Sequence, residues 1–318
     1  MVQFLVKRLI GLIFVLIGVT FITFMMGYWS PITPVQILMG NHFDPQLYNQ
    51  LMHQYGLDLP WYQQYYNFLV NLIHLNFGQS YQHRGESVWS IIAQGVPITL
   101  ELGFWGLILQ FVIGVPLGIL SALKANTWID TANMGTLLFL YAIPVFVLAV
   151  FVRVVIVWLD LNAGANWPPT GWGTPWAYDW TDLQYKIAPI LVFAIGGAAY
   201  IARMARTSFL EVFRQDYIRT ARAKGLIERI VIYRHAFRNA LIPLVTIFGL
   251  SIGFLVTGSF FIENIFNIPG IANTTIVSVT GQDFPVIQGT TVILAVFVVL
   301  GNLISDILYT IIDPRIKY

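Results

Sequence analysis

The sequence predicts an all-α, polytopic membrane protein with six transmembrane helices. Composition is the first reason: 57% of the 318 residues are hydrophobic, only 10% are charged, and the mean hydropathy is +0.71. A soluble domain has about 25% charged residues and fewer than half apolar residues. The second reason is a series of long apolar segments, and the third is the placement of basic residues between them.

Six apolar segments reach, or nearly reach, the roughly 20 residues that a bilayer-crossing helix takes. They are Leu9 to Trp29, the segment between Glu101 and Lys124, Asp130 to about Leu159, the segment between Lys186 and Arg203, Ala240 to Ile262, and about Val286 to Leu308. The first is longer than the ~7–15 residues of a signal-peptide core, so we expect it to be retained. The fourth is the shortest, and we expect Lys186 and Arg203 to extend their side chains to opposite interfaces.

The basic residues predict the orientation. With the N-terminus in the cytoplasm, residues 1–8, 124–130, 203–239 and 309–318 lie inside, and they hold 14 of the 17 Lys and Arg residues. Positive residues accumulate in cytoplasmic loops. We therefore expect both termini to be cytoplasmic.

Two domains are predicted. Residues 1–95 comprise the first transmembrane helix and an extracytoplasmic helical segment, and residues 96–318 form a five-helix core with a cytoplasmic loop at 203–239. In the outer segment, Asp44 and Pro45 start a helix that Gly56 ends. A second, aromatic-rich helix is expected from Pro60 to near Gly78. A tryptophan-rich outer loop, from Asp160 to Gln184, is expected to be an ordered lid over the outer mouth.

Several kinds of chemistry are absent from the sequence. There are no cysteines, which excludes disulfides and thiolate sites. No GxxxxGK[ST] motif occurs, so we expect the chain not to hydrolyse ATP itself. No HExxH occurs, and the histidines of the outer segment lack the spacing of metal ligands. We therefore expect no enzymatic activity, no metal, no cofactor and no nucleic-acid partner.

Two features could suggest a membrane enzyme or an ATP-independent carrier. Gly249 to Gly253 matches the GxSxG pattern of hydrolases, but no histidine is available at that depth, so we interpret it as a helix-packing motif. Arg153 lies within the third apolar segment, where it either extends to the interface or pairs with an acidic group. No series of ionisable residues crosses the bilayer, which argues against an ion-coupled carrier.

The stretch from Asp216 to Leu226, DYIRTARAKGL, is a short basic helix between two predicted spans. Tyr217, Ala221 and Gly225 are four residues apart and form one stripe of decreasing size. Gly225 is placed to end the helix. Two interpretations remain open, an anchor on anionic lipid and a docking helix whose small-residue face enters a groove on another protein. A second helical piece is expected from about Ile227 to Asn239.

This stretch resembles the coupling loop, or EAA loop, of ABC-importer permeases, and most closely that of the dipeptide/oligopeptide branch. His235-Ala236, Arg238-Asn239-Ala240 and Pro243 continue the resemblance. Arg219-Thr220-Ala221 stands where the general motif has Glu-Ala-Ala. Further similar patterns occur along nearly the whole chain: Gly56-Leu57-Asp58, Phe77-Gly78-Gln79-Ser80, Gly114-Val115-Pro116-Leu117-Gly118, Asp283-Phe284-Pro285 and Asp313-Pro314-Arg315-Ile316. One departure is Ile271-Ala272, where Leu-Gly is common.

The resemblance implies the type I ABC-importer permease fold and a transport function. Such a permease pairs with a second, homologous permease, two ABC ATPase subunits and an extracytoplasmic substrate-binding protein in the bilayer of a prokaryotic cell membrane. The residues implied in coupling to the ATPase are Tyr217, Arg219, Thr220, Ala221, Ala223, Lys224 and Gly225. The branch implies di- or oligopeptides as cargo. A nickel chelate, glutathione or an oligosaccharide remains an alternative, since nothing in the chain separates them.

Overall fold

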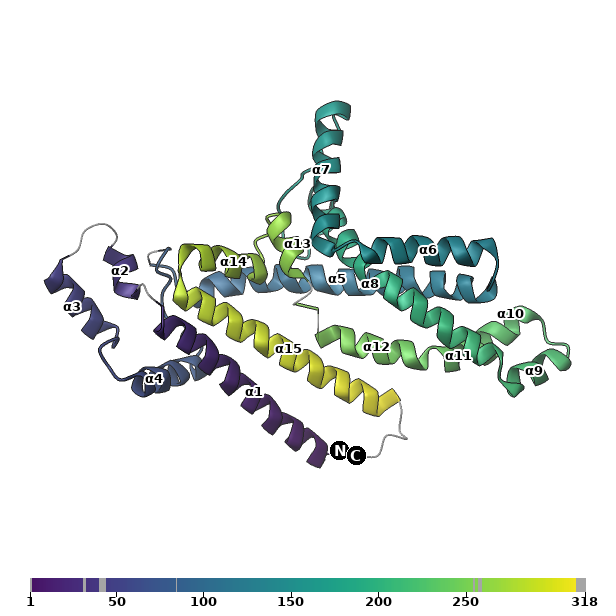
Figure 1. Cartoon of the computed structure of the whole chain (residues 1–318), viewed down its shortest axis with the longest axis horizontal. Helices are drawn as coiled ribbons and strands as arrows, with labels where there is room; N and C mark the ends of the chain where they lie inside the picture. The colour runs from purple at the N-terminus through teal and green to yellow at the C-terminus, as the bar shows by residue number, and fades with distance from the viewer. Residues whose placement is uncertain are drawn as a thin grey trace. The chain divides into compact units, whose positions relative to one another are not determined.

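A computed structural model of the chain describes residues 2–30, 33–39, 44–83, 85–253, 255–256 and 259–312. Within these ranges every regular element is a helix, apart from an isolated antiparallel bridge between Gln79 and Ser87 (Figure 1). The all-α prediction is therefore confirmed. The sequence pattern from Asp313 to Ile316 lies outside the described residues.

The chain forms two compact units, one made of Met1–Ile98 and Pro269–Phe297 and the other of Thr99–Ile268 and Val298–Tyr318. The division predicted at residue 95 is a functional one, between the outer segment and a transport core. This functional division stays a prediction. By contacts, the first unit also takes in the segment from Pro269 to Phe297.

The first unit is built from five complete helices and the beginnings of two longer ones. They are α1 (Val2–Tyr28), α2 (Pro34–Met39), α3 (Pro45–Gln54), α4 (Trp61–Ile73) and α14 (Ile271–Gly281), with the first parts of α5 (Val88–Leu123) and α15 (Phe284–Ile312). Its core is apolar and joins the start of α5 to the start of α15. The buried members of this core are Phe77, Val88, Ile92, Val286 and Val292.

The predicted start and end of α3 are confirmed. The carboxylate of Asp44 accepts hydrogen bonds from the backbone N–H groups of Gln46 at 2.8 Å and Leu47 at 3.4 Å. Gly56 follows the helix with a φ of +64°, in the left-handed region that favours glycine. The prediction for α4 was too long, because the helix ends at Ile73 and the left-handed Leu75, with φ +55°, turns the chain before Gly78.

The second unit contains the remaining helices. They are α6 (Trp128–Ala142), α7 (Val145–Ala163), α8 (Trp180–Phe213), α9 (Asp216–Ala223), α10 (Glu228–Ile230), the π-helical η1 (Val231–Ala236), α11 (Phe237–Ala240), α12 (Ile242–Gly253) and α13 (Phe260–Ile265). The main parts of α5 and α15 complete the unit.

Glycines allow α5 and α8 to approach closely. A Cβ atom added to Gly114 would lie 2.7 Å from the carbonyl oxygen of Ala198, and one added to Gly118 would lie 2.5 Å from the Cβ of Ala205. Real Cβ atoms do not come this near to other atoms, so only glycine fits at either position. Small residues four apart are the usual means by which membrane helices pack backbone to backbone.

Six candidate spans are present among the described residues. Five single helices, α1, α5, α7, α8 and α15, are long and apolar enough to cross a membrane. The sixth is a pair, Glu228–Ala240 and Ile242–Gly253, with a bend of 45° between its two parts. The predicted number of six is met when this bent pair is one span.

Two of the predicted spans have a different form in the structure. The third segment is two helices, because Pro144 has no N–H to donate and holds Ile143 in an extended conformation, with ψ 121°. Figure 1 shows α7 turning away from α6 at this point. The fifth segment is also not one helix from Ala240 to Ile262, since α12 ends at Gly253 and α13 begins at Phe260. In both places hydropathy continues across the break, so composition did not reveal it.

Candidate functional site

The predicted coupling helix is present as α9, a helix of eight residues. Asp216 lies in its first turn and Arg222 in its last, so both charges complement the helix dipole. Its inner side buries Ile218 completely, against Val231 and Ala236 of η1. The following helices therefore hold α9 in place within the chain itself.

The C-terminal end of α9 is a Schellman motif. The N–H of Gly225 donates to the carbonyl of Arg222 at 2.9 Å, and the N–H of Leu226 donates to the carbonyl of Ala221 at 3.4 Å. Gly225 has φ +74°, and a Cβ there would meet no atom within 4 Å. The backbone conformation, and not lack of space, therefore calls for glycine, as predicted.

Two side-chain bridges tie α9 to the segment that follows it. The guanidinium of Arg222 donates to both carboxylate oxygens of Glu228, at 3.1 and 2.6 Å, and this bond raises the pKa of Arg222 above its usual value. At the other end, the Asn239 amide donates to the hydroxyl of Tyr217 at 2.8 Å. The predicted second helical piece is present as α10, η1 and α11, and these bridges fix it beside α9.

The surface of α9 differs from the prediction at one residue. Among the seven predicted coupling residues, the exposed ones are Tyr217, Arg219, Thr220, Ala223, Lys224 and Gly225. Ala221 is only 5% exposed, because it packs against η1 and against Val212 and Phe213 at the end of α8. Its small size is therefore explained by packing inside the chain, and the expectation that Ala221 faces a partner is wrong.

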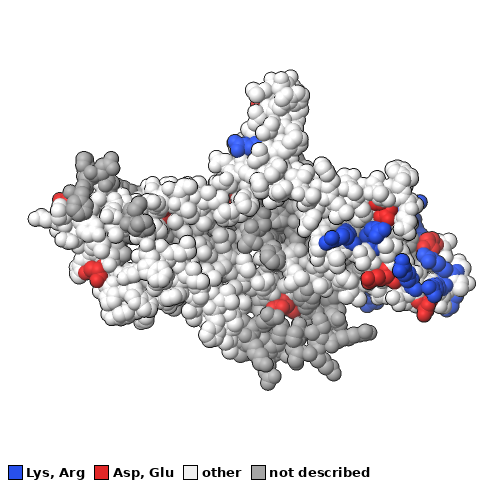
Figure 2. Space-filling view, viewed as in Figure 1, with Lys and Arg blue, Asp and Glu red and all other residues white. Residues whose placement is uncertain are grey.

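The exposed face of this segment is strongly basic. Figure 2 shows Lys and Arg side chains gathered over the end of the unit that holds α9 to α11, with several acidic groups among them. Nine of the 17 basic residues lie between Arg203 and Arg238. Ile227 and Tyr233 add apolar surface, with exposed fractions of 66% and 65%. The surface can thus present both charge and apolar area to a partner.

An ion pair between a half-buried arginine and a buried aspartate holds α8 against α6 close to this segment. The guanidinium of Arg206 donates to both carboxylate oxygens of Asp130, at 2.7 and 2.6 Å. Asp130 also accepts from the backbone N–H of Asn126 at 3.0 Å. The start of α6 is therefore fixed to the last part of α8, the helix that leads into α9.

A second buried ion pair was not anticipated. Lys186 on α8 is fully buried and donates to Glu101 of α5 at 2.8 Å. Its ammonium also donates to the carbonyls of Thr174 and Ala177, each at 2.8 Å. The expectation that Lys186 extends to the membrane interface is therefore wrong, because a carboxylate and two carbonyls surround it inside the unit.

The carboxylate of Glu101 also holds the tryptophan-rich loop. It accepts from the indole N–H of Trp172 at 2.9 Å and from the backbone N–H of Trp176 at 2.8 Å. Trp172 is 1% exposed. The loop between α7 and α8 is thus ordered, as predicted, while its role as a lid stays a prediction. The sequence signal was the acidic residue that borders the second apolar segment together with the lysine that borders the fourth.

Within the described residues, Arg153 is held by a backbone carbonyl and not by an acidic side chain, while its extension to the interface stays a prediction. It lies in the middle of α7 and donates to the carbonyl of Ile265 at 2.6 Å. That carbonyl is at the end of α13, so the arginine ties α7 to α13 through the backbone.

The GxSxG pattern is a packing motif, as predicted. A Cβ on Gly249 would lie 3.1 Å from the hydroxyl of Ser305, and one on Gly253 would lie 2.5 Å from the amide oxygen of Asn302. The hydroxyl of Ser251 donates to the carbonyl of Ile247 at 2.8 Å. In the part of the chain that the structure describes, no three His, Asp or Glu side chains are grouped as metal ligands.

The chain belongs to the family described as binding-protein-dependent transport system inner membrane component. Residues 114–318 match the model of this family, and residues 1–103 match that of its N-terminal region. It is therefore a permease of the kind that the coupling stretch predicted, and the apolar helices make it a multi-pass membrane protein.

Named relatives match along the whole chain. The oligopeptide transport system permease protein AppB of Bacillus subtilis is 38% identical over 321 residues, with full coverage of both chains. The di/tripeptide permease DppB of Pseudomonas aeruginosa is 36% identical, with 100% of this chain and 99% of the relative covered. The glutathione permease GsiC of Shigella flexneri is 34% identical, again with full coverage of both chains.

Solved structures support the fold. The inward-facing MetNI methionine ABC transporter superposes with a TM-score of 0.56 at 22% identity, covering 70% of this chain and 97% of the other. An amino acid ABC transporter gives a TM-score of 0.50 at 17% identity, covering 71% and 94%. The predicted ABC-importer permease fold is confirmed.

Proposed function

We propose that this permease imports di- or oligopeptides, driven by two ABC ATPase subunits, together with a second homologous permease and an extracytoplasmic binding protein. The names of the AppB and DppB relatives support this cargo. Glutathione is the second candidate, favoured by the GsiC relative. Membership of a binding-protein-dependent transport family supports the partners.

The α9 segment is the surface that carries the motion of the ATPase to this permease. The observation that carries this proposal is its construction: a short helix closed by Gly225, bridged by Arg222 to Glu228, and exposed along its basic side. A preformed helix loses little conformational entropy when it docks. A rigid connection to α8 also transmits displacement better than a mobile loop.

The test of coupling is Ala223→Glu, at a small and exposed position of α9. Burying an unpaired carboxylate in a groove costs several kcal/mol, so uptake is expected to fall by at least about tenfold, the factor for 1.4 kcal/mol. Ala93→Glu, at an exposed alanine of α5, is the matched control. Normal uptake by Ala223→Glu in proteoliposomes with all partners would overturn the assignment. Ala221→Glu is unsuitable, because that residue is buried.

Orientation and cargo have separate tests. The chain has no cysteine, so single cysteines report sidedness directly. In intact cells an impermeant maleimide is expected to label Gln63→Cys, and to label Ala223→Cys only after permeabilisation. The reverse pattern contradicts the orientation. For cargo, labelled di- and tripeptides should enter proteoliposomes that contain the binding protein, whereas uptake of glutathione alone would favour the second candidate.

A further inference from the structure

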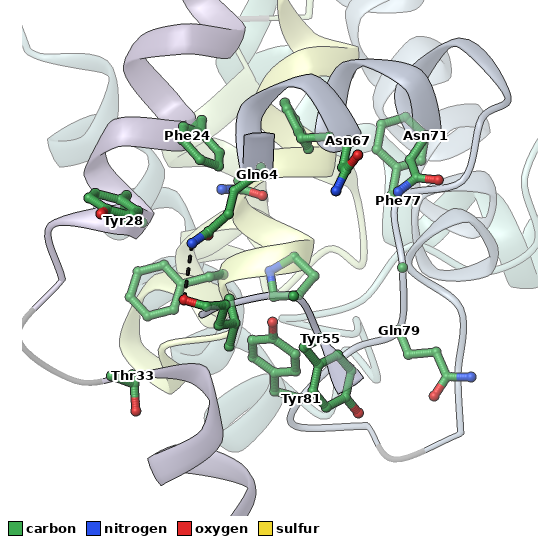
Figure 3. Close-up of a pocket in the computed structure, with 18 of the residues that line it drawn as sticks. Phe24, Tyr28, Thr33, Tyr55, Gln64, Asn67, Asn71, Phe77, Gln79 and Tyr81 are labelled. Atoms are coloured by element: carbon green, nitrogen blue, oxygen red, sulfur yellow. Dashed lines mark hydrogen bonds between the residues drawn. The ribbon is translucent and has the colours of Figure 1, made fainter. Parts of the chain in front are cut away.

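The first unit contains a cavity beside the helices α1 and α4. Its volume is about 350 Å³, within the range of about 300–1,000 Å³ that small-molecule sites occupy. The walls come from the end of α1, from α3 and α4, from the segment 76–81 and from the start of α15 (Figure 3). All of these belong to the first unit, so the cavity is complete within it.

The lining has an unusual chemistry. It combines aromatic rings with side-chain amides, and none of the described residues that line it is Asp, Glu, Lys, Arg or His. The aromatic residues are Phe24, Tyr28, Tyr55, Phe68, Phe77, Tyr81 and Phe284, and the amides come from Gln64, Asn67, Asn71, Asn76, Gln79 and Gln288. A charged ligand would find no counter-charge here, and burying an unpaired charge is costly.

One side of the helix α4 carries amides that line the cavity, and Asn67 and Asn71 among them are exposed. Gln64, Asn67, Phe68 and Asn71 follow the i, i+3, i+4, i+7 pattern of one helical face, and all four line the cavity. Its other faces are apolar and exposed, with Tyr62 at 56%, Tyr66 at 66% and Ile73 at 80%.

The position of α4 accounts for the exposed apolar side. It packs against α1, where the rings of Phe21 and Tyr65 lie 5.4 Å apart and the Tyr65 hydroxyl donates to the carbonyl of Ile17 at 3.2 Å. That stretch of α1 belongs to the candidate span Ile10–Tyr28, so the apolar side of α4 suits a lipid environment. The amides of α4 lie on a different side of the helix and line the cavity, which is open to the surface.

The cavity walls are held in place by other hydrogen bonds. Gln64 donates to the carbonyls of Leu57 at 3.1 Å and Leu59 at 2.8 Å, which fixes the turn after α3. Asp283 accepts from the Ser80 hydroxyl and from the backbone N–H of Tyr81 at 3.1 Å, which fixes the segment that carries Gln79.

Four of the six amides remain available to a ligand. Within the described residues, the side-chain amides of Asn67, Asn71, Gln79 and Gln288 make no hydrogen bond to the rest of the chain. In Figure 3, Asn67 lies on the cavity wall formed by α4, and Tyr55 and Tyr81 lie together on the wall opposite. Burial raises the pKa of Tyr81, so its hydroxyl keeps its proton at neutral pH and can donate.

We propose that this cavity binds a neutral, hydroxyl-rich small molecule such as a sugar. Each amide offers both donors and an acceptor, which suits hydroxyl groups that donate and accept. The aromatic rings provide apolar surfaces for the C–H faces of a sugar ring. A zwitterionic peptide fits poorly, since nothing neutralises its termini, and an acyl chain would leave the amides unpaired. Binding of such a molecule goes beyond the peptide import proposed above.

The experiment is calorimetric titration of the complete transporter in phosphatidylcholine nanodiscs. Alkyl glycoside detergents are avoided, because their sugar headgroups belong to the ligand class under test. The probes are glucose, maltose and glucuronate, with a diglucosyl lipid in the nanodisc as a separate arm. Neutral sugar, free or as the lipid headgroup, is expected to bind, and glucuronate to bind at least about tenfold more weakly, a difference of 1.4 kcal/mol. The two arms distinguish a soluble ligand from a glycolipid.

Variants locate the binding. Asn67→Leu and Asn71→Leu should each weaken sugar binding by about tenfold, again the factor for 1.4 kcal/mol. Gln63→Leu makes a comparable change on the same helix outside the cavity lining and should leave binding unchanged. The absence of binding in both arms overturns the proposal, as does binding that neither asparagine variant weakens. Peptide uptake by the same preparations measures the proposed function independently.

Discussion

Replacing Lys186 by methionine removes the cation from the buried pair with Glu101 while keeping a long apolar side chain. The side chains of this pair are 1% and 0% exposed, so water cannot take over the lost contacts. The carboxylate keeps the two N–H groups of Trp172 and Trp176 but loses its counter-charge. Breaking a buried pair by removing one partner typically costs about 3–5 kcal/mol.

A double variant separates the lost charge from the lost hydrogen bonds. Glu101→Gln in addition to Lys186→Met leaves no buried charge, and the glutamine oxygen can still accept from Trp172. Contacting residues commonly show interaction energies of about 0.5–3 kcal/mol. We therefore expect the double variant to be more stable than Lys186→Met alone by about 2 kcal/mol, although still below the unchanged protein.

The assay is the free energy of unfolding, measured by titration with sodium dodecyl sulfate in mixed micelles. Protease cleavage between residues 164 and 179 provides a second readout, since Lys186 and Glu101 both hold this loop. The reasoning is refuted if Lys186→Met is within about 1 kcal/mol of the unchanged protein, the value typical of an exposed pair. It is also refuted if the double variant is no more stable than Lys186→Met.

Two further predictions concern helix packing and the outer segment. Gly118→Ala should destabilise the folded protein by about 1–3 kcal/mol through overpacking. Gly135→Ala, where an added Cβ would meet no atom, should stabilise it by about 0.4–1 kcal/mol. Equal effects of the two variants in unfolding titrations would contradict the α5–α8 contact. His53 should titrate above 6.5 by NMR, because its hydrogen bond to Asp58 raises its pKa, and Asp58→Asn should return it toward 6.5. The same bond lowers the pKa of Asp58, so the pair stabilises the folded state at pH values between the folded-state pKa of Asp58 and that of His53. This contribution is lost as pH rises through the pKa of His53 or falls through the pKa of Asp58. An unchanged His53 titration in Asp58→Asn would show that the pair does not form.

Local signals in the sequence predicted helix ends well. Asp44 and Gly56 bound α3, and Gly225 ends α9, because capping and left-handed conformations depend on a few adjacent residues. The break at Pro144 was missed, because the apolar segment continues on both sides and a proline within a span is often tolerated. Hydropathy alone therefore gave one long segment where the chain has α6 and α7.

The sequence predicted where the candidate coupling site lies along the chain, but not which of its residues are exposed. The spacing of Tyr217, Ala221 and Gly225 indicated a common face, yet Ala221 packs against η1 while Tyr217 is 40% exposed. Which side of a short amphipathic helix is covered depends on the segment that folds back over it. For α9 the covering residues are Val231 and Ala236 of η1, which follow α9 in the chain.

The sequence by itself determined the class of protein, the number of apolar segments, both ends of α3, the end of α9 and the position of the coupling stretch. These properties follow from composition, spacing and residues that are neighbours in the chain. The tertiary structure decided the partner of Lys186, the hydrogen bond of Arg153, the buried position of Ala221 and the cavity that side-chain amides line. Each of these depends on side chains distant in sequence, and the cost of burying a polar group without a partner selects which of them meet.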